Sequence, residues 1–223
     1  MTRRDEGWSG RVHSTVGLVA AVLSMATPSL AFEPALSQPD IRQALDAGGA
    51  MARAHRGFDV RAYTLYSVHD ALSLQPVRSS VDAVVVGTPY ERVAYVGYES
   101  AVDRLAPTAS LIAKASAPCT VDFILFAHGA DKSDRSFLAR FAKVRVRAAG
   151  MTLAPTTTDL GRGSTLDTFL LPNGGNADRW IGHVAYRFGL CAVAGAAGPK
   201  GTLFFTDPDG RKFSLPFDLA DYR

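Results

Sequence analysis

A series of short β-prone runs in the C-terminal half constrains the fold most, because several of these runs end in sequences typical of turns. Val144-Arg145-Val146-Arg147 alternates in polarity, and Ala149-Gly150 separates it from Met151-Thr152-Leu153, which predicts a hairpin. Asp207-Pro208-Asp209-Gly210 is a strong turn signal between two further runs. The runs lie at 121–127, 144–147, 151–153, 180–190, 202–206 and 212–217. Their number and spacing predict an antiparallel sandwich or barrel.

Helical patterns come before these runs. Ser37 precedes a proline and an acidic residue, as at a helix N-terminus, and apolar residues then recur at helical spacing. The pair Gly48-Gly49 is expected to weaken this helix in its middle. Thr88-Pro89-Tyr90-Glu91 has the capping-box pattern, which predicts that the Glu91 side chain caps the start of a second helix.

The chain is therefore predicted to be an α+β protein, with N-terminal helices packed on an antiparallel β-sandwich. A β-branched run at 81–86 predicts a further strand. The predicted divisions are a signal peptide at 1–31, a mixed helical region at 32–118 and a β-rich sandwich domain at 119–223. The sandwich is Ig-like in architecture but not in motif, because the core tryptophan and the tyrosine-corner spacing of immunoglobulin domains are missing.

The first 31 residues have the three parts of a secretory signal peptide. Arginines come first, an apolar stretch without charges runs from Val16 to Ala26, and Ser29-Leu30-Ala31 offers the small residues of a cleavage site. The apolar stretch is too short to cross a membrane. We expect a periplasmic or secreted protein that begins at Phe32 and has no transmembrane segment in the mature chain.

The bulk properties of the mature chain favour one compact domain. Removing residues 1–31 leaves 192 of the 223 residues, enough for a substantial core. The mature chain has a net charge of only +2, because three of the 24 basic and two of the 21 acidic residues lie in the removed segment. Basic residues are not concentrated in a stripe, so no nucleic-acid partner is predicted.

Cys119 and Cys191 both lie in the mature chain. In an exported protein the pair predicts one structural disulfide, worth about 4 kcal/mol for a loop of roughly seventy residues. Their spacing is not the Cys-x-x-Cys of a redox pair.

The segment most like part of an enzyme is the strand that ends at His128-Gly129. Such a strand end resembles the oxyanion loop of α/β-hydrolases, and Asp131, Asp134 or Ser100 would have to complete the site. The nucleophile elbow of that fold is missing, because Gly161-Arg162-Gly163-Ser164-Thr165 has its serine in the wrong frame. His69-Asp70 is also a weak candidate, because adjacent residues on a strand point to opposite faces.

No metal or other cofactor is predicted. The mature histidines are not at the spacing that arranges zinc ligands, and the Asp-rich turns at 131–134 and 207–210 lack the closing glutamate of an EF-hand loop. Side-chain hydrogen bonds to the turn backbone explain these aspartates better. Because these signals are weak, a divalent-metal-binding protein is only the third functional alternative.

The residues most typical of a binding surface form two groups. Tyr90, Tyr95 and Tyr98 lie close together on the second predicted helix, and Phe169, Leu170 and Leu171 interrupt a polar stretch at 161–176 that reads as a long loop. Aromatic side chains are frequent at interfaces, and apolar loop tips are frequent docking elements. The leading expectation is an exported, non-catalytic binding or assembly protein with another envelope protein as partner, and the alternative is an exported hydrolase that uses His128.

Overall fold

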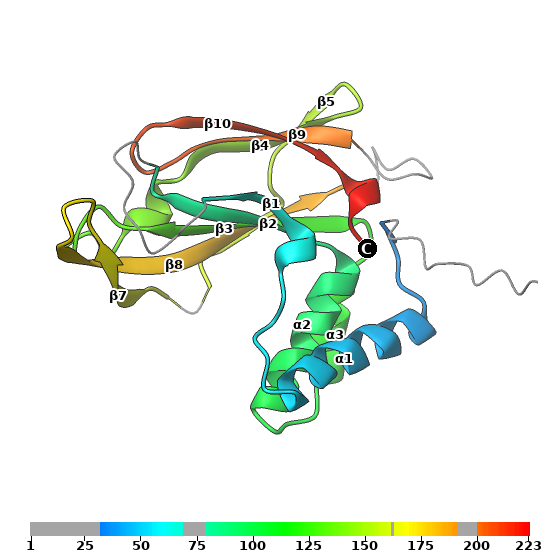
Figure 1. Ribbon diagram of the computed structural model, residues 1–223. Helices are drawn as coiled ribbons and strands as arrows, with labels where there is room; N and C mark the ends of the chain where they lie inside the picture. The colour runs from blue at the N-terminus through cyan, green and yellow to red at the C-terminus, as the bar shows by residue number, and fades with distance from the viewer. Residues whose placement is uncertain (1–31, 69–78, 162, 191–199) are drawn as a thin grey trace, which may run out of the picture.

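The computed structural model describes residues 32–68, 79–161, 163–190 and 200–223, and within them the protein is α+β, with three α-helices and two antiparallel sheets (Figure 1). The predicted signal peptide, His69-Asp70 and Cys191 lie outside the described residues. The predicted fold class is confirmed at the level of α+β with antiparallel sheets.

The larger sheet, called sheet A, is built around one long strand. The 14-residue strand β8 (Asn176–Gly189) pairs with β3 (Thr120–His128) along one edge. Its other edge pairs with β6 (Thr157–Asp159) and β7 (Thr165–Leu170). Beyond β3 follow β2 (Val81–Gly87) and the edge strand β1 (Thr64–Ser67). Because β2 pairs with β3, sheet A joins the regions 32–118 and 119–223.

The smaller sheet, sheet B, contains both hairpins that the sequence predicts. Its order is β10 (Lys212–Asp218), β9 (Lys200–Thr206), β4 (Ala142–Ala148) and β5 (Met151–Leu153). The β4–β5 turn has positive φ at both central residues, 47° at Ala149 and 77° at Gly150. Two such residues match the twist of the flanking strands, which explains why this hairpin could be predicted.

The inward faces of the two sheets enclose the main core. Alternate residues of β3 point into it, so Val121, Phe123 and Leu125 are fully buried. The Phe123 ring contacts Phe188 of β8 at 5.7 Å and Phe217 of β10 at 5.1 Å between centroids. These contacts across the two sheets fix their relative position.

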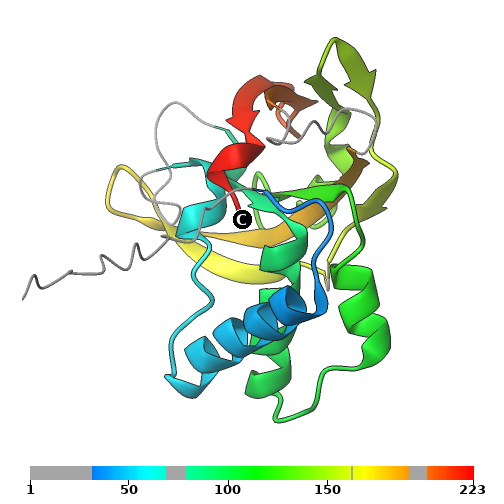
Figure 2. The same cartoon turned by 90° about the vertical axis from the view of Figure 1, so that its right-hand side faces the viewer.

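Three helices lie on the side of sheet A that is turned away from sheet B, beneath one end of the sheet (Figures 1 and 2). They are α1 (Gln38–Arg53), α2 (Pro89–Val102) and α3 (Ala109–Ala115). The N-caps are Ser37, Thr88 and Thr108, whose hydroxyl oxygens accept hydrogen bonds from backbone N–H groups of the first turn. The predicted helix starts at Ser37 and Thr88 are confirmed.

The predicted weakness at Gly48-Gly49 has a packing reason. At the crossing of α1 and α2, a Cβ on Gly48 would overlap the backbone carbonyl of Ala94, and one on Gly97 would overlap that of Leu45. The two helix backbones therefore approach closely only because these residues are glycine. The glycine pair lowers helix propensity, and in the structure Gly48 permits the close contact between the two helices.

The predicted loop at 161–176 is partly wrong, because this segment contains β7. Among the residues of β7 only Phe169 is buried, so the strand has no clear alternation for a sequence analysis to detect. Pairing with the long strand β8 holds it in place. In the described ranges, no helix has the length and apolar character needed to cross a bilayer.

Candidate functional site

A cavity of about 430 Å³ lies between the helices and the outer face of sheet A. We call it the helix–sheet cavity. Its floor comes from alternation in β3, because Asp122, Ile124 and Phe126 point outward while their neighbours fill the main core. Val85 of β2 extends the floor, and Leu111 of α3 contributes an apolar wall. The cavity has the size and mainly apolar lining of a small-molecule site.

Arg92 fastens the helices to the sheet at one end of this cavity. Its Nε donates to the Ala115 carbonyl, Nη1 donates to the Gly87 and Thr120 carbonyls, and Nη2 donates to the Ala117 carbonyl and the Thr120 hydroxyl. A guanidinium has five N–H groups, so all of them are used within the protein. Burial lowers the pKa of Arg92 to about 10, which leaves it charged at pH 7. Arg92 therefore has a structural role.

Asp122 and Arg187 form a second fixed pair on the cavity floor. Arg187 Nε and Nη2 donate to the two Asp122 carboxylate oxygens at 2.7 and 2.8 Å. The two residues face each other in the β3–β8 register, and the hydrogen bond to Asp122 raises the pKa of Arg187. A bidentate pair of this geometry is among the stronger side-chain contacts, so both oxygens of Asp122 are engaged.

Glu91 lies beside these pairs and makes no such contact. It is only 4% exposed, it lines the cavity, and among the described residues its carboxyl has no hydrogen-bond partner. Desolvation by burial raises its pKa to about 8, with Asp122 adding to the rise and Arg92 opposing it. The carboxyl is therefore mostly protonated at pH 7. Strong burial and a displaced pKa in a cavity are typical of functional groups.

The predicted capping role of Glu91 is not what the structure shows. The Glu91 N–H donates to the Thr88 hydroxyl at 3.1 Å, so half of the capping box forms. The side chain lies in the cavity instead of returning to the start of the helix. A glutamate at this position of a helix reads as a cap from sequence, which is why its second role was missed.

The three tyrosines of the predicted binding surface separate into a pair and a single residue. Tyr95 is 43% exposed and lines the cavity, and its ring stacks on Tyr98 at 6.4 Å between centroids. Phe58 contacts both rings and makes an aromatic rim with them. Tyr90 lies apart, with the Arg223 guanidinium 4.3 Å from its ring centroid.

The second predicted group, Phe169 to Leu171, lies at another part of the molecule. β7 lies at the end of sheet A away from the helices (Figure 1), so the two groups do not form one surface. Phe169 is only 1% exposed and contacts the His128 ring at 4.9 Å between centroids. It therefore belongs to the packing of the fold, whereas Leu170 is 52% exposed.

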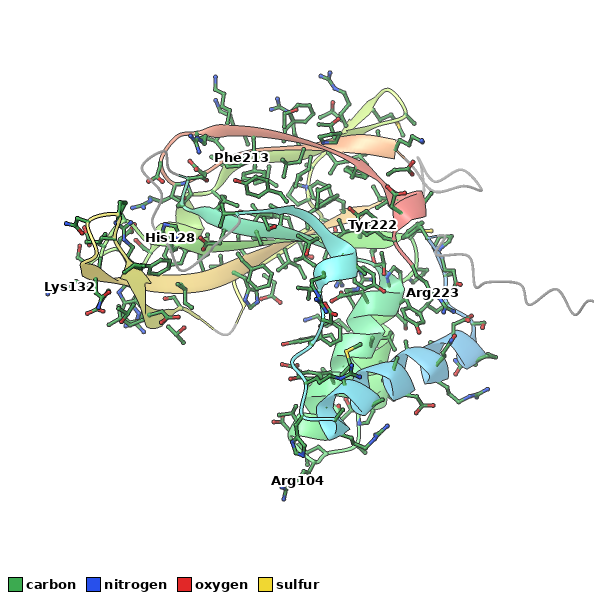
Figure 3. The ribbon with its side chains drawn as sticks, in the orientation of Figure 1. Arg104, His128, Lys132, Phe213, Tyr222 and Arg223 are labelled. Carbon is green, nitrogen blue, oxygen red and sulfur yellow. The ribbon has the colours of Figure 1, made fainter. Side chains whose placement is uncertain are left out.

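His128 lies toward this same end of sheet A (Figure 3). It is 6% exposed, and its Nδ1 is 2.9 Å from the Asp82 carboxylate oxygen Oδ1. Burial raises the pKa of Asp82, and the contact with His128 opposes this rise. A polar residue within the β-branched run 81–86 was the only sequence signal for Asp82.

The residues predicted to assist His128 are engaged elsewhere. Asp131 accepts from the N–H and hydroxyl of Ser133. Asp134 accepts from the Ala130 N–H at 2.9 Å and from Arg140 at 2.6 Å. Ser100 lies near the end of α2, on the helical layer. The partner of His128 is instead Asp82.

His183 lies between the two polar ends of sheet A. Its ring contacts Phe126 at 5.5 Å between centroids, and burial lowers its pKa, so it is neutral at pH 7. Phe126 and His183 line both the helix–sheet cavity and a second hollow that contains Asp82 and Phe169. Gly161, with φ of 66°, lies against the His183 ring where a Cβ would collide. The outer face of sheet A is therefore hollowed along much of β3.

The Asp-rich turns bind their own backbone. Asp207 Oδ1 accepts from the N–H groups of Asp209 and Arg211 at 3.0 and 2.8 Å, as the turn sequence predicts. Across the described ranges, no group of three or more His, Cys, Asp or Glu side chains is placed to hold a metal ion.

Comparison with solved structures finds a distant similarity. No family model matches the chain, and no curated protein matches it. A solved structure of a novel protein of unknown function from Burkholderia pseudomallei K96243 is similar over 85% of this chain and 96% of that one, with 10% sequence identity and a TM-score of 0.36.

Proposed function

We propose that this is an exported, non-catalytic binding protein that holds a small, mainly apolar ligand in the helix–sheet cavity. The observation that carries the proposal is a cavity of about 430 Å³ whose apolar floor adjoins a buried carboxyl group, that of Glu91. Burying a polar group without a partner costs free energy, and a ligand that hydrogen-bonds to Glu91 would recover it.

Export is the part of this proposal that rests on the sequence of residues 1–31. The basic start, the short apolar stretch and the Ser29-Leu30-Ala31 cleavage site support a periplasmic or secreted location. In that location the partner would be a small molecule of the envelope, or an envelope protein that docks on the exposed rim at Tyr95 and delivers or receives the ligand.

Filling the cavity tests the proposal. Ile124→Trp adds an indole to the cavity floor, and Leu166→Trp adds the same group at a residue of β7 that is 51% exposed. The mature protein and both variants are screened by thermal shift against envelope-derived small molecules, since a ligand raises the melting temperature of the protein that binds it. We expect a shift that survives Leu166→Trp and disappears in Ile124→Trp. A ligand whose shift is unchanged in Ile124→Trp would place binding elsewhere.

We further propose that the two sheets form a β-sandwich closed by a Cys119–Cys191 disulfide. The Leu190 N–H donates to the Cys119 carbonyl at 2.7 Å, which supports the pairing because Cys191 is the next residue. Mass spectrometry of the alkylated, non-reduced protein tests it. Two alkylated cysteines would exclude the bond.

A hydrolase that uses His128 is the second candidate, and the 2.9 Å contact between His128 and Asp82 favours it. A carboxylate that orients a histidine is the arrangement of a general base. Ser80 lies opposite His128, and the backbone N–H of His128 donates to the Ser80 carbonyl. The Ser80 hydroxyl is buried and has no hydrogen-bond partner within the described part of the chain. The hydrolase predicts turnover of an ester panel that His128→Ala abolishes without lowering the melting temperature much. Equal rates in the variant would exclude it.

A further inference from the structure

We propose that the ligand of the helix–sheet cavity carries one protonated amine on an apolar body, and that the Glu91 carboxylate binds the ammonium group. This inference rests on the proposed function and names the class of ligand. Three observations carry it: the missing partner of Glu91, the charge of the cavity lining and the nature of the walls.

The first observation is that, of the two buried acids that line the cavity, Glu91 and Asp122, only Glu91 has no hydrogen-bond partner among the described residues. Arg92 donates all five of its N–H groups to carbonyl and hydroxyl oxygens of the protein. Asp122 has both oxygens on Arg187. The Glu91 carboxyl, 4% exposed, has no hydrogen-bond partner among the described residues, and it borders the cavity. A group from the ligand is the partner that this position can receive.

The second observation is that the lining has one negative charge in excess once Glu91 is ionised. Four carboxyl groups line the cavity against three basic side chains, and His183 is neutral because burial lowers its pKa. With all four carboxyl groups ionised, a ligand with one positive charge brings the lining to neutrality. The charged residues are Glu91, Glu99, Asp122, Asp159, Arg92, Lys114 and Arg187.

The third observation is that the rest of the wall suits the body of such a ligand. Val85, Ile124 and Leu111 offer apolar surface. Phe58 and Phe126 add aromatic rings, whose faces attract cations. An anionic ligand would lie next to the Asp122 carboxylate, which repels it, and could form no ion pair with the protonated Glu91. The lining therefore fits an ammonium group with an aromatic or aliphatic tail.

Binding moves one proton, because Glu91 is mostly protonated in the empty cavity. The ammonium ion enters with its charge, the Glu91 carboxyl releases its proton to solvent, and an ion pair replaces the neutral acid. The charged or titratable groups that interact with Glu91 are Tyr63, Arg92 and Asp122, and Arg187 lines the same cavity. Of these, Tyr63 keeps its proton because burial raises its pKa. Glu91 is thus the group that titrates when the ligand binds.

The test compares three probes of similar shape by isothermal titration calorimetry: 2-phenylethylammonium, the neutral 2-phenylethanol and the anionic 3-phenylpropionate. We expect the mature protein to bind the ammonium probe at least about tenfold more tightly than the alcohol, as one charge-assisted contact is worth. Glu91→Gln keeps a polar group of the same shape and removes the charge. It should bind both probes equally.

Asp103→Asn is the matched control, because Asp103 is an exposed acid at the end of the same helix and is not among the described residues that line the cavity. We expect this variant to keep the preference for the ammonium probe. Loss of the preference in both variants would assign the effect to overall charge and overturn the role of Glu91.

Proton release gives a second readout. Below about pH 8 the affinity for the ammonium probe should fall by up to about tenfold per pH unit, because Glu91 must first lose its proton. The heat of binding should also depend on the ionisation enthalpy of the buffer in the mature protein and not in Glu91→Gln.

The outcomes separate this inference from the proposal beneath it. Equal binding of the amine and the alcohol, abolished by Ile124→Trp, would overturn the inference and leave the cavity as the binding site. Tighter binding of 3-phenylpropionate would overturn it in the same way. If none of the three probes binds, the inference fails, and the ligand screen with Ile124→Trp still decides the proposed function.

Discussion

At the scale of single residues, Glu91 ties stability to pH. Its pKa of about 8 in the folded protein exceeds the ordinary glutamate value of 4.5, so between these two pH values the folded state holds a proton that the unfolded state has lost. The free energy of unfolding should therefore fall as the pH rises from about 5 to about 8, by up to about 1 kcal/mol per pH unit.

Urea denaturation of the wild type and of Glu91→Gln across this range isolates the effect, because all other titrating groups are shared. The difference in free energy of unfolding between the two proteins should change steadily with pH. A constant difference would mean that Glu91 titrates normally.

Arg92 shows how one side chain can hold two layers together. It joins the end of α3, the end of β2 and the start of β3 through carbonyl oxygens. Arg92→Lys keeps the charge but cannot reach these acceptors at once, so it should lower the free energy of unfolding by about 3 kcal/mol. Arg61→Lys, at an exposed ion pair with Asp59, is the control and should leave the urea midpoint unchanged. Equal effects would contradict this role.

At the scale of elements, the crossing of α1 and α2 predicts opposite effects on stability when two adjacent glycines are replaced by alanine. A Cβ on Gly48 would overlap the α2 backbone, whereas one on Gly49 would meet only the end of the flexible Arg53 side chain. Gly48→Ala should destabilise the protein by about 1–3 kcal/mol, and Gly49→Ala should stabilise it by up to about 1 kcal/mol through helix propensity. Thermal and urea unfolding of both variants check this. A stabilising Gly48→Ala would mean that the helices do not cross at this residue.

The elements that could be predicted are those whose signals are local. The β4–β5 hairpin depends on its own turn, and the starts of α1 and α2 depend on their own N-caps. β7 could not be predicted because Phe169 is the one buried residue of the strand, so the sequence shows no alternation, and its pairing with β8 is a contact that the pattern does not reveal. Tyr95 is the predicted surface residue that the structure places on the cavity. Glu91, Asp122 and Arg187 meet only through tertiary contacts, which spacing in one sequence does not reveal.

At the scale of the whole molecule, the described residues form two hydrophobic cores of unequal size. The core between the sheets contains large side chains such as Phe123, Phe188 and Leu203. The buried members of the core of the helical layer are Ala44, Val93, Ala94 and Ala115. Because stability follows the apolar area removed from water, the helical layer should open more readily than the sheets.

Native-state hydrogen exchange tests this difference. Amides of α1 and α2 should exchange through openings of lower free energy than those of β3 and β8, and a cavity ligand should slow the exchange of α2 and α3 most. The same opening free energy in the helices and the sheets would show that they unfold as one unit.

The regular rise per residue of β3 fixes the distances between side chains on the outer face of sheet A. Asp122 and His128 stand six residues apart on this strand, which corresponds to roughly 20 Å at about 3.3 Å per residue. The ladders to β2 and β8 on either side prevent the strand from stretching or slipping. A compact ligand can contact Asp122 at one end of β3 or His128 at the other, whereas only an extended ligand could contact both residues.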